Sequence, residues 1–272
     1  MNDAITILHD LTTKPHCLLP HYADALKTKL RLYIENDDFE LPDSDKPHSK
    51  HLYEVIDDIA VVTVNGIICK RVGLSADLLE YFNLVDLDNL DAAVKQLTQD
   101  DAIKSVVFYI TSPGGFVSGL TTTWQYIDAL SKKKETVVFS DVINASAAYY
   151  ISSAARMIVA SYDAEVGSIG TFTELVSISR QLADNGIDAR IIQGGSLKAI
   201  GHPYKPLDQE TIDYVQSEVN AIWLQFKDVV NTKRTIDDTD MQGQTFAGKP
   251  LVDKGFVDGL ARDIEEVITM LK

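Results

Sequence analysis

From Ile59 onward, β-branched runs alternate with helical segments, and this alternation limits the possible folds more than any other feature of the chain. Strands that alternate with helices indicate an α/β core whose neighbouring strands pair in parallel. We predict strands over residues 59–64, 106–110, 137–139, 157–160 and 189–192. We predict helices over residues 90–97, 122–130, 145–155, 175–185 and 208–231.

The first 50 residues differ in character from the rest. Apolar residues recur there at the spacing of a short amphipathic helix, and they are Tyr22, Ala25, Leu26, Leu30 and Tyr33. Six acidic residues then fall between Glu35 and Asp45, a pattern typical of a solvated linker. The sequence therefore predicts an N-terminal arm and acidic linker over residues 1–50, followed by one larger domain over residues 51–272.

Composition excludes several classes of function. The 272 residues carry a net charge of −15, which argues against a protein that binds nucleic acid or anionic lipid. Two distant cysteines, Cys17 and Cys69, give neither a disulfide framework nor a zinc pattern, so we expect no metal and no cofactor. No apolar run reaches the length of a membrane span and no secretion signal opens the chain, so we expect a cytoplasmic protein without a membrane anchor.

A proline followed by two glycines, in Ser112-Pro113-Gly114-Gly115, ends the predicted strand 106–110. Such a turn exposes backbone N–H groups and can hold an oxyanion. It can equally serve only to reverse the chain, and taken alone this simpler interpretation is favoured.

A serine flanked by alanines, Ser146, follows the predicted strand 137–139 at the start of a helix. As a nucleophile it would have the Ala147 N–H beside it to stabilise an oxyanion. As a structural residue it would cap the helix or permit close packing. These two interpretations stay open on the sequence of this stretch alone.

Lys198 lies among small and apolar residues after the predicted strand 189–192. A lysine that is removed from water loses pKa and can act as a general base, although an ordinary loop lysine is the simpler interpretation. Five of the six histidines lie in or near the arm and linker, and only His202 is near these stretches. A Ser–Lys dyad needs no histidine.

Together these stretches resemble the signal peptide peptidase A family of serine peptidases, and the resemblance runs from about Ile59 to Leu260. It is carried by Thr111–Gly115, Ala145–Tyr150, Val166–Gly170 and Gly195–Lys198, in the family's order and spacing. The resemblance implies a Clp-protease-like or crotonase-like α/β fold, built as a spiral of ββα units around a parallel sheet. Residues 51–272 would then form the peptidase domain.

The resemblance also implies a role for each matching residue. Ser146 would be the nucleophile, Lys198 its general base and Ser168 the residue that orients the lysine. The Gly114 and Ala147 amides would form the oxyanion hole. An extended protein or peptide substrate would lie along two segments near the site, which comprise Gly115, Phe116, Val117 and Ser118 on one side and Thr171, Phe172 and Thr173 on the other.

Within this family Ser and Lys can meet across a subunit boundary, so the resemblance implies a homo-oligomer with contacts near the active site. The segments Leu18–Tyr22 and Gly201–Tyr204 look more like phage head-maturation proteases of the lambda protein C type. Capsid or scaffold proteins would then be the partners, and the location would be the host cytoplasm or the phage prohead. The alternatives are a cytosolic signal-peptide or protein-degrading peptidase, a crotonase-like acyl-CoA enzyme and a non-catalytic assembly protein.

Overall fold

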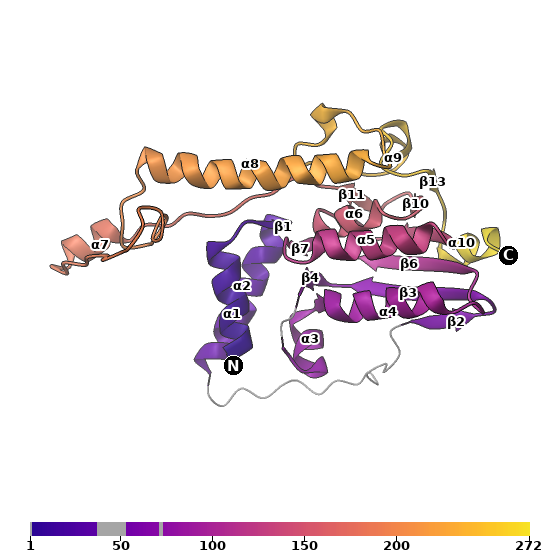
Figure 1. Cartoon of the computed structure of the whole chain (residues 1–272), viewed down its shortest axis with the longest axis horizontal. Helices are drawn as coiled ribbons and strands as arrows, with labels where there is room; N and C mark the ends of the chain where they lie inside the picture. Colours follow the sequence, from indigo (N-terminus) through magenta and orange to yellow (C-terminus); the bar gives the residue numbers. More distant parts are fainter. Residues whose placement is uncertain (1, 37–52, 71–72) are drawn as a thin grey trace.

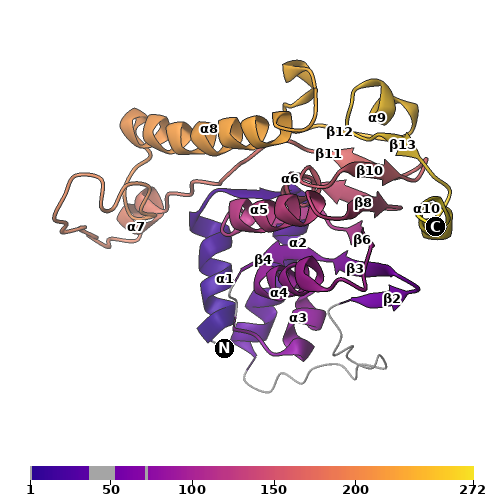
Figure 2. The ribbon, with the colours of Figure 1, turned by 45° about the vertical axis from the view of Figure 1, so that its right-hand side comes forward.

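A six-stranded sheet forms the centre of the molecule in the computed structural model, which describes residues 2–36, 53–70 and 73–272 (Figures 1 and 2). In spatial order the strands are β13 (Gly259–Leu260), β10 (Met157–Ala160), β8 (Glu135–Ser140), β6 (Ser105–Thr111), β3 (Ile59–Asn65) and β2 (Glu54–Ile56). Every neighbouring pair is parallel except the antiparallel pair β2 and β3. The α/β core with a parallel sheet is therefore confirmed.

Four strands of this sheet continue, after a short turn, into a second strand that belongs to a smaller sheet. The continuing strands are β4 (Ile67–Cys69), β7 (Gly114–Phe116), β9 (Ile143–Ala145) and β11 (Glu165–Gly167). Two of them lead directly into helices, β7 into α5 (Leu120–Ser131) and β9 into α6 (Ala147–Ser152). The chain thus repeats a ββα pattern, in which β7 and β9 each bring the end of a strand close in sequence to the start of a helix.

The smaller sheets have the orders β1-β7-β4-β5 and β12-β11-β9. Their remaining strands are β5 (Leu84–Asp86) and β12 (Thr245–Phe246), together with β1 (His16–Leu18) from the N-terminal arm. Strand β1 pairs antiparallel with β7, so the arm supplies an edge strand of the main domain.

The arm folds as α1 (Asn2–Thr13), β1 and α2 (Pro20–Glu35), which confirms the amphipathic helix and adds one that the sequence analysis missed. The arm packs against the main domain through an apolar cluster that is separate from the central core. Its residues are Ala4, Ile7, Leu11, Leu18, Ala23, Leu26, Leu30, Ile67, Cys69, Phe82, Leu84 and Phe116. Nearly all of the predicted acidic linker lies outside the described residues.

The other helices cover the sheet or extend from it. They are α3 (Ala76–Phe82), α4 (Leu87–Gln99), α7 (Ser179–Asp184), α8 (Gln209–Asn231), α9 (Lys249–Asp253) and α10 (Ile264–Met270), with a short 3₁₀ turn over Asp238–Asp240. Figures 1 and 2 show the long helix α8 along one side of the body, while α7 and its flanking chain project beyond it. Within the described part of the chain, no helix is both long and apolar enough to span a membrane.

Three sequence predictions need correction. Residues 189–192 form no strand, and Ile192 is 97% exposed. In the part of the chain that the structure describes, the β-branched residues of this stretch have no neighbouring strand to pair with, so their β-propensity does not produce a strand. The helix expected over residues 175–185 is reduced to α7. The helix expected over residues 145–155 is reduced to α6, because residue 145 still belongs to β9.

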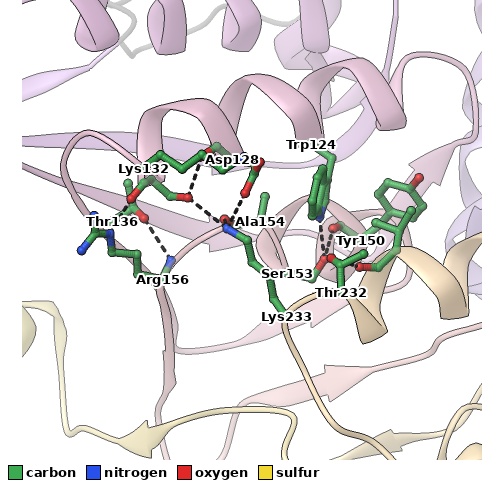
Figure 3. Close-up of polar contacts among 12 residues, drawn as sticks. Trp124, Asp128, Lys132, Thr136, Tyr150, Ser153, Ala154, Arg156, Thr232 and Lys233 are labelled. Carbon is green, nitrogen blue, oxygen red and sulfur yellow. Dashed lines mark hydrogen bonds and ion pairs between the residues drawn. The ribbon is translucent and has the colours of Figure 1, made fainter.

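A polar network fixes the C-terminal end of α8 to α5 and to the end of α6 (Figure 3). Lys233 Nζ contacts Asp128 Oδ1 at 2.7 Å and donates to the Ala154 carbonyl at 2.5 Å. Lys132 Nζ contacts the other Asp128 oxygen at 2.6 Å. Burial opposes ionisation of Asp128, but hydrogen bonds from the two lysines prevail and lower the pKa of its carboxyl. This network holds one end of α8 while its other end leads out to the projecting chain.

Candidate active site

Ser146 lies at a sharp turn between β9 and α6. Its backbone angles are φ 55° and ψ −119°, a conformation that a side chain disfavours. Its N–H donates to the Gly167 carbonyl at 2.8 Å, which holds the turn in place. A strained serine between a strand and a helix is the arrangement that exposes a nucleophile at the edge of a sheet. Here Ser146 is only 2% exposed.

Ser168 lies beside Ser146 because the two strands that precede them are paired. Strands β9 and β11 run parallel, with Ala145 opposite Gly167. Each serine directly follows the last residue of its strand, and Ser168, like Ser146, has a positive φ, of 53°. Its N–H donates to the Gln244 carbonyl at 2.8 Å. The structure therefore brings together two of the three predicted catalytic residues.

Gly114 approaches the nucleophile from β7. A β-carbon built on Gly114 would lie 2.9 Å from the Ser146 β-carbon, so only a glycine permits this approach. The Gly114 amide, however, donates to Ser112 Oγ at 3.2 Å. The Gly114 N–H, which was predicted to donate to the oxyanion, is therefore already engaged by a side chain in this structure. Ala147, the other predicted donor, is fully buried as the first residue of α6.

Lys198 lies on the projecting chain between α7 and α8, where it is exposed to solvent. Figures 1 and 2 both show this chain extending away from α6. The expected desolvation of Lys198 is thus wrong for a single chain, because the predicted buried strand before it does not form. Within one chain, Ser146 and Ser168 therefore lie together and Lys198 lies apart from them.

The two segments predicted to hold substrate lie on either side of β1. On one side β1 pairs with β7 in the register His16 to Phe116 and Cys17 to Gly115. On the other side it forms a bridge with Phe172. Val117 is half-buried and Ser118 exposed beyond β7, and Thr171 and Thr173 flank the bridge. The predicted substrate edges do face one another, and the arm lies between them.

Cys17 and His16 are the residues of this region that the sequence analysis missed. Cys17 Sγ lies 3.3 Å from Thr171 Oγ1. Burial raises the pKa of the Cys17 thiol to about 11, although hydrogen bonds with Thr171 and Ser146 oppose the rise. Cys17 therefore lies beside Ser146. The only sequence signal was the short apolar run before Pro20, which is too brief to identify a strand.

The residues around these serines also match a known family. The model of peptidase family S49 matches residues 128–272, more than half of the chain and the part that contains Ser146, Ser168 and Lys198. The chain belongs to peptidase family S49. This membership confirms the serine-peptidase resemblance drawn from the motifs.

Relatives of this S49 chain come from an archaeon and a bacteriophage. A relative from Methanocaldococcus jannaschii is 31% identical over 188 residues, which cover 67% of this chain and 57% of the relative. The capsid assembly protease C of Escherichia phage lambda is 24% identical over 231 residues, which cover 84% of this chain and 52% of that protein. The S49 chain thus spans little more than half the length of these relatives.

Among solved structures, a membrane-bound stomatin-specific protease in complex with a substrate peptide is similar in outline to the S49 chain. The match has a TM-score of 0.38 and 14% identity, and it covers 78% of this chain and 77% of that one. The fold assignment rests instead on the strand order and the parallel pairing described above.

Proposed function

We propose that this S49 chain is a serine endopeptidase that cleaves extended protein segments, with Ser146 as nucleophile and Lys198 of a neighbouring copy as general base. The observation that carries the proposal is the separation of Ser146 from Lys198 within one chain. Ser146 occupies a preformed turn beside Ser168 and Gly114, whereas Lys198 lies exposed on a segment that projects from the body. A second copy could receive that segment.

The chemistry follows from the roles assigned to these groups. The neutral Lys198 amine takes the proton of the Ser146 hydroxyl while Ser146 Oγ bonds to the substrate carbonyl carbon. The Ala147 N–H faces the oxygen that becomes negative. The carbon–nitrogen bond then breaks, and the leaving amine takes the proton from Lys198. Water, deprotonated by Lys198, hydrolyses the acyl-enzyme and restores Ser146.

The exposed apolar side chains of the projecting segment support assembly with a second copy. Ile192 is 97% exposed, Val176 61% and Leu197 43%, the last directly before Lys198. Exposed apolar side chains that lie on one segment are typical of a surface that is covered in an assembly. Burial against a neighbour would also remove Lys198 from water, which favours the neutral amine that a base requires.

The test combines two inactive variants. Ser146→Ala and Lys198→Met should each abolish cleavage of a denatured protein while leaving the fold and the oligomeric state unchanged. When the two are co-expressed, about a quarter of the interfaces in a head-to-tail ring pair an intact serine with an intact lysine. Activity should therefore return to about that fraction of the unmodified protein.

The possible outcomes separate the parts of the proposal. Full activity in Ser146→Ala would refute the peptidase site. Two inactive variants that fail to restore each other would refute the exchange of Lys198 between copies. The similarity to the capsid assembly protease of phage lambda makes capsid and scaffold proteins suitable first substrates for these assays.

A further inference from the structure

Strand β1 of the arm occupies the groove in which the proposed peptidase would bind its substrate. One edge of β1 pairs with β7, placing Cys17 opposite Gly115. On the other edge, the His16 N–H donates to the Phe172 carbonyl at 3.0 Å and the Phe172 N–H donates to the His16 carbonyl at 3.2 Å. A peptide bound by strand addition uses the same main-chain groups of the same two segments. Strand β1 and a substrate therefore compete for them.

The strand also covers the nucleophile. The Cys17 carbonyl is so near Gly114 that a β-carbon built on Gly114 would lie 2.2 Å from it. Leu19, the next residue after β1, donates its N–H to the Pro113 carbonyl at 3.1 Å. Ser146 is 2% exposed beneath this crossing, although its hydroxyl must reach a substrate carbonyl. With β1 in place, Ser146 is therefore almost fully shielded from solvent.

The Cys17 side chain enters the site as a substrate side chain would. It borders a small apolar pocket that is also lined by Val117, Leu120, Tyr150 and Phe226. It also contacts Thr171, from the second predicted substrate segment. The arm thus fills a side-chain position as well as the main-chain positions.

One residue of β1 is poorly satisfied in the groove. His16 is 1% exposed, and among the described residues its Nε2 has no hydrogen-bond partner, while Nδ1 lies 3.1 Å from the Lys14 carbonyl. A buried polar nitrogen without a partner costs free energy that many substrate strands would not incur. Strand β1 therefore carries a penalty that favours its replacement by a better-fitting strand.

We propose that β1 is a resident strand that closes the substrate groove and must leave it before a protein substrate binds. The inference rests on the proposed peptidase function, since it concerns access to the same site. The competing explanation is that β1 is a fixed wall of the groove and that substrate binds elsewhere along it. A fixed wall and a resident strand respond in opposite ways when β1 is locked in place.

A reversible cross-link locks the strand without removing any part of the arm. His16→Cys and Phe172→Cys replace the bridge pair, in a background that carries Cys17→Ala and Cys69→Ala to prevent other disulfides. The reduced form of this variant is the control for its oxidised form. The readouts are cleavage of a denatured protein and labelling of Ser146 by a serine-directed acylating probe.

Oxidation should reduce cleavage and labelling to about a tenth or less of the reduced form, because the open state is no longer populated. Adding reductant should restore both. An oxidised form as active as the reduced form would overturn the inference while leaving the peptidase proposal intact. If the reduced form, the background protein and the unmodified protein all fail to cleave any substrate, the peptidase proposal fails and this inference falls with it.

A second variant loosens the strand instead of locking it. His16→Pro removes the N–H that donates to Phe172, so β1 should leave the groove more often. The KM for a short extended peptide should fall several-fold, with kcat little changed. A rise in KM would identify β1 as part of the binding wall and overturn the inference. A cut between residues 16 and 19 that disappears in Ser146→Ala would make β1 a substrate and would likewise overturn its role as a resident strand.

Discussion

Gly115 is the position at which one added methyl group should disturb the substrate groove most directly. It lies in the middle of β7, paired with Cys17 of β1 on one side and with Ile68 of β4 on the other. A β-carbon built there would lie 2.0 Å from the Ile68 carbonyl oxygen and 2.6 Å from its carbonyl carbon. Gly115→Ala must therefore push β4 and β7 apart by about 1 Å before the methyl group reaches an acceptable contact.

The cost of this displacement can be estimated from the atoms involved. Overpacking of a core costs about 1–3 kcal/mol, and the upper end applies here because the obstructing atoms are backbone and β7 is paired on both edges. At roughly 2.1 cal/mol/K of unfolding entropy per residue over the whole chain, about 3 kcal/mol corresponds to a fall in Tm of about 5 °C.

Calorimetry of Gly115→Ala beside Gly259→Ala tests this reasoning. Gly259 also lies in a strand, but a β-carbon built there meets no atom within 4 Å. The Gly259 variant should stay within about 1 °C of the unmodified protein. If Gly115→Ala melts with the control variant, the close approach of β4 and β7 is wrong, and with it the geometry of the groove.

Two further predictions concern the body and the arm. Tyr149 is fully buried on α6 and donates to the Phe256 carbonyl at 2.8 Å, so Tyr149→Phe should lower the free energy of unfolding in denaturant by about 1–2 kcal/mol. Tyr162→Phe, at a 63% exposed position, should change this free energy by less than about 0.5 kcal/mol. Equal effects of the two substitutions would refute the role of the buried hydroxyl. Burial lowers the pKa of His16 below 6.5, opposed by the Lys14 carbonyl, with Lys27 lowering it further and Glu174 raising it. The unfolded or released arm then binds the extra proton, so the arm stays docked above about pH 6.5 and loosens as the pH falls below it. The protection of the β1 amides, measured as hydrogen exchange relative to the intrinsic rate at each pH, should fall between about pH 7.5 and about pH 5.5 in the unmodified protein but not in His16→Phe, and an equal fall in both would exclude His16 as the cause.

The sequence predicted the long buried strands because their β-branched runs need no partner to be recognised. Strands β3 and β6 lie close to their predicted bounds. The three-residue strands β4, β7 and β9 carry too little periodicity to predict, and they exist because the main-sheet strands turn into a second layer. The apparent strand at residues 189–192 has β-propensity but no neighbour, and propensity alone does not create a sheet.

The grouping of Ser146, Ser168 and Gly114 was predicted from the resemblance of their motifs to a peptidase family, and the short strands that bring them together were not predicted. The surroundings of Lys198 were not accessible in this way. Its burial depends on where a long connection travels and on what covers it, and neither is encoded in residues close to the lysine. The same limit hid β1, whose place beside Gly115 depends on pairing across almost a hundred residues.

Strand β1 and Lys198 bear on different steps of the proposed reaction. Strand β1 pairs with β7 and bridges to Phe172, so in the proposal it opposes substrate binding and leaves the chemistry of Ser146 unchanged once it has moved. Lys198 is the proton acceptor of the proposed reaction and lies exposed in the single chain, so in the proposal it governs the chemical step. Closure of the groove by the arm and separation of the base from the nucleophile are therefore independent barriers, and a chain that has released its arm but stands alone would bind substrate without cleaving it.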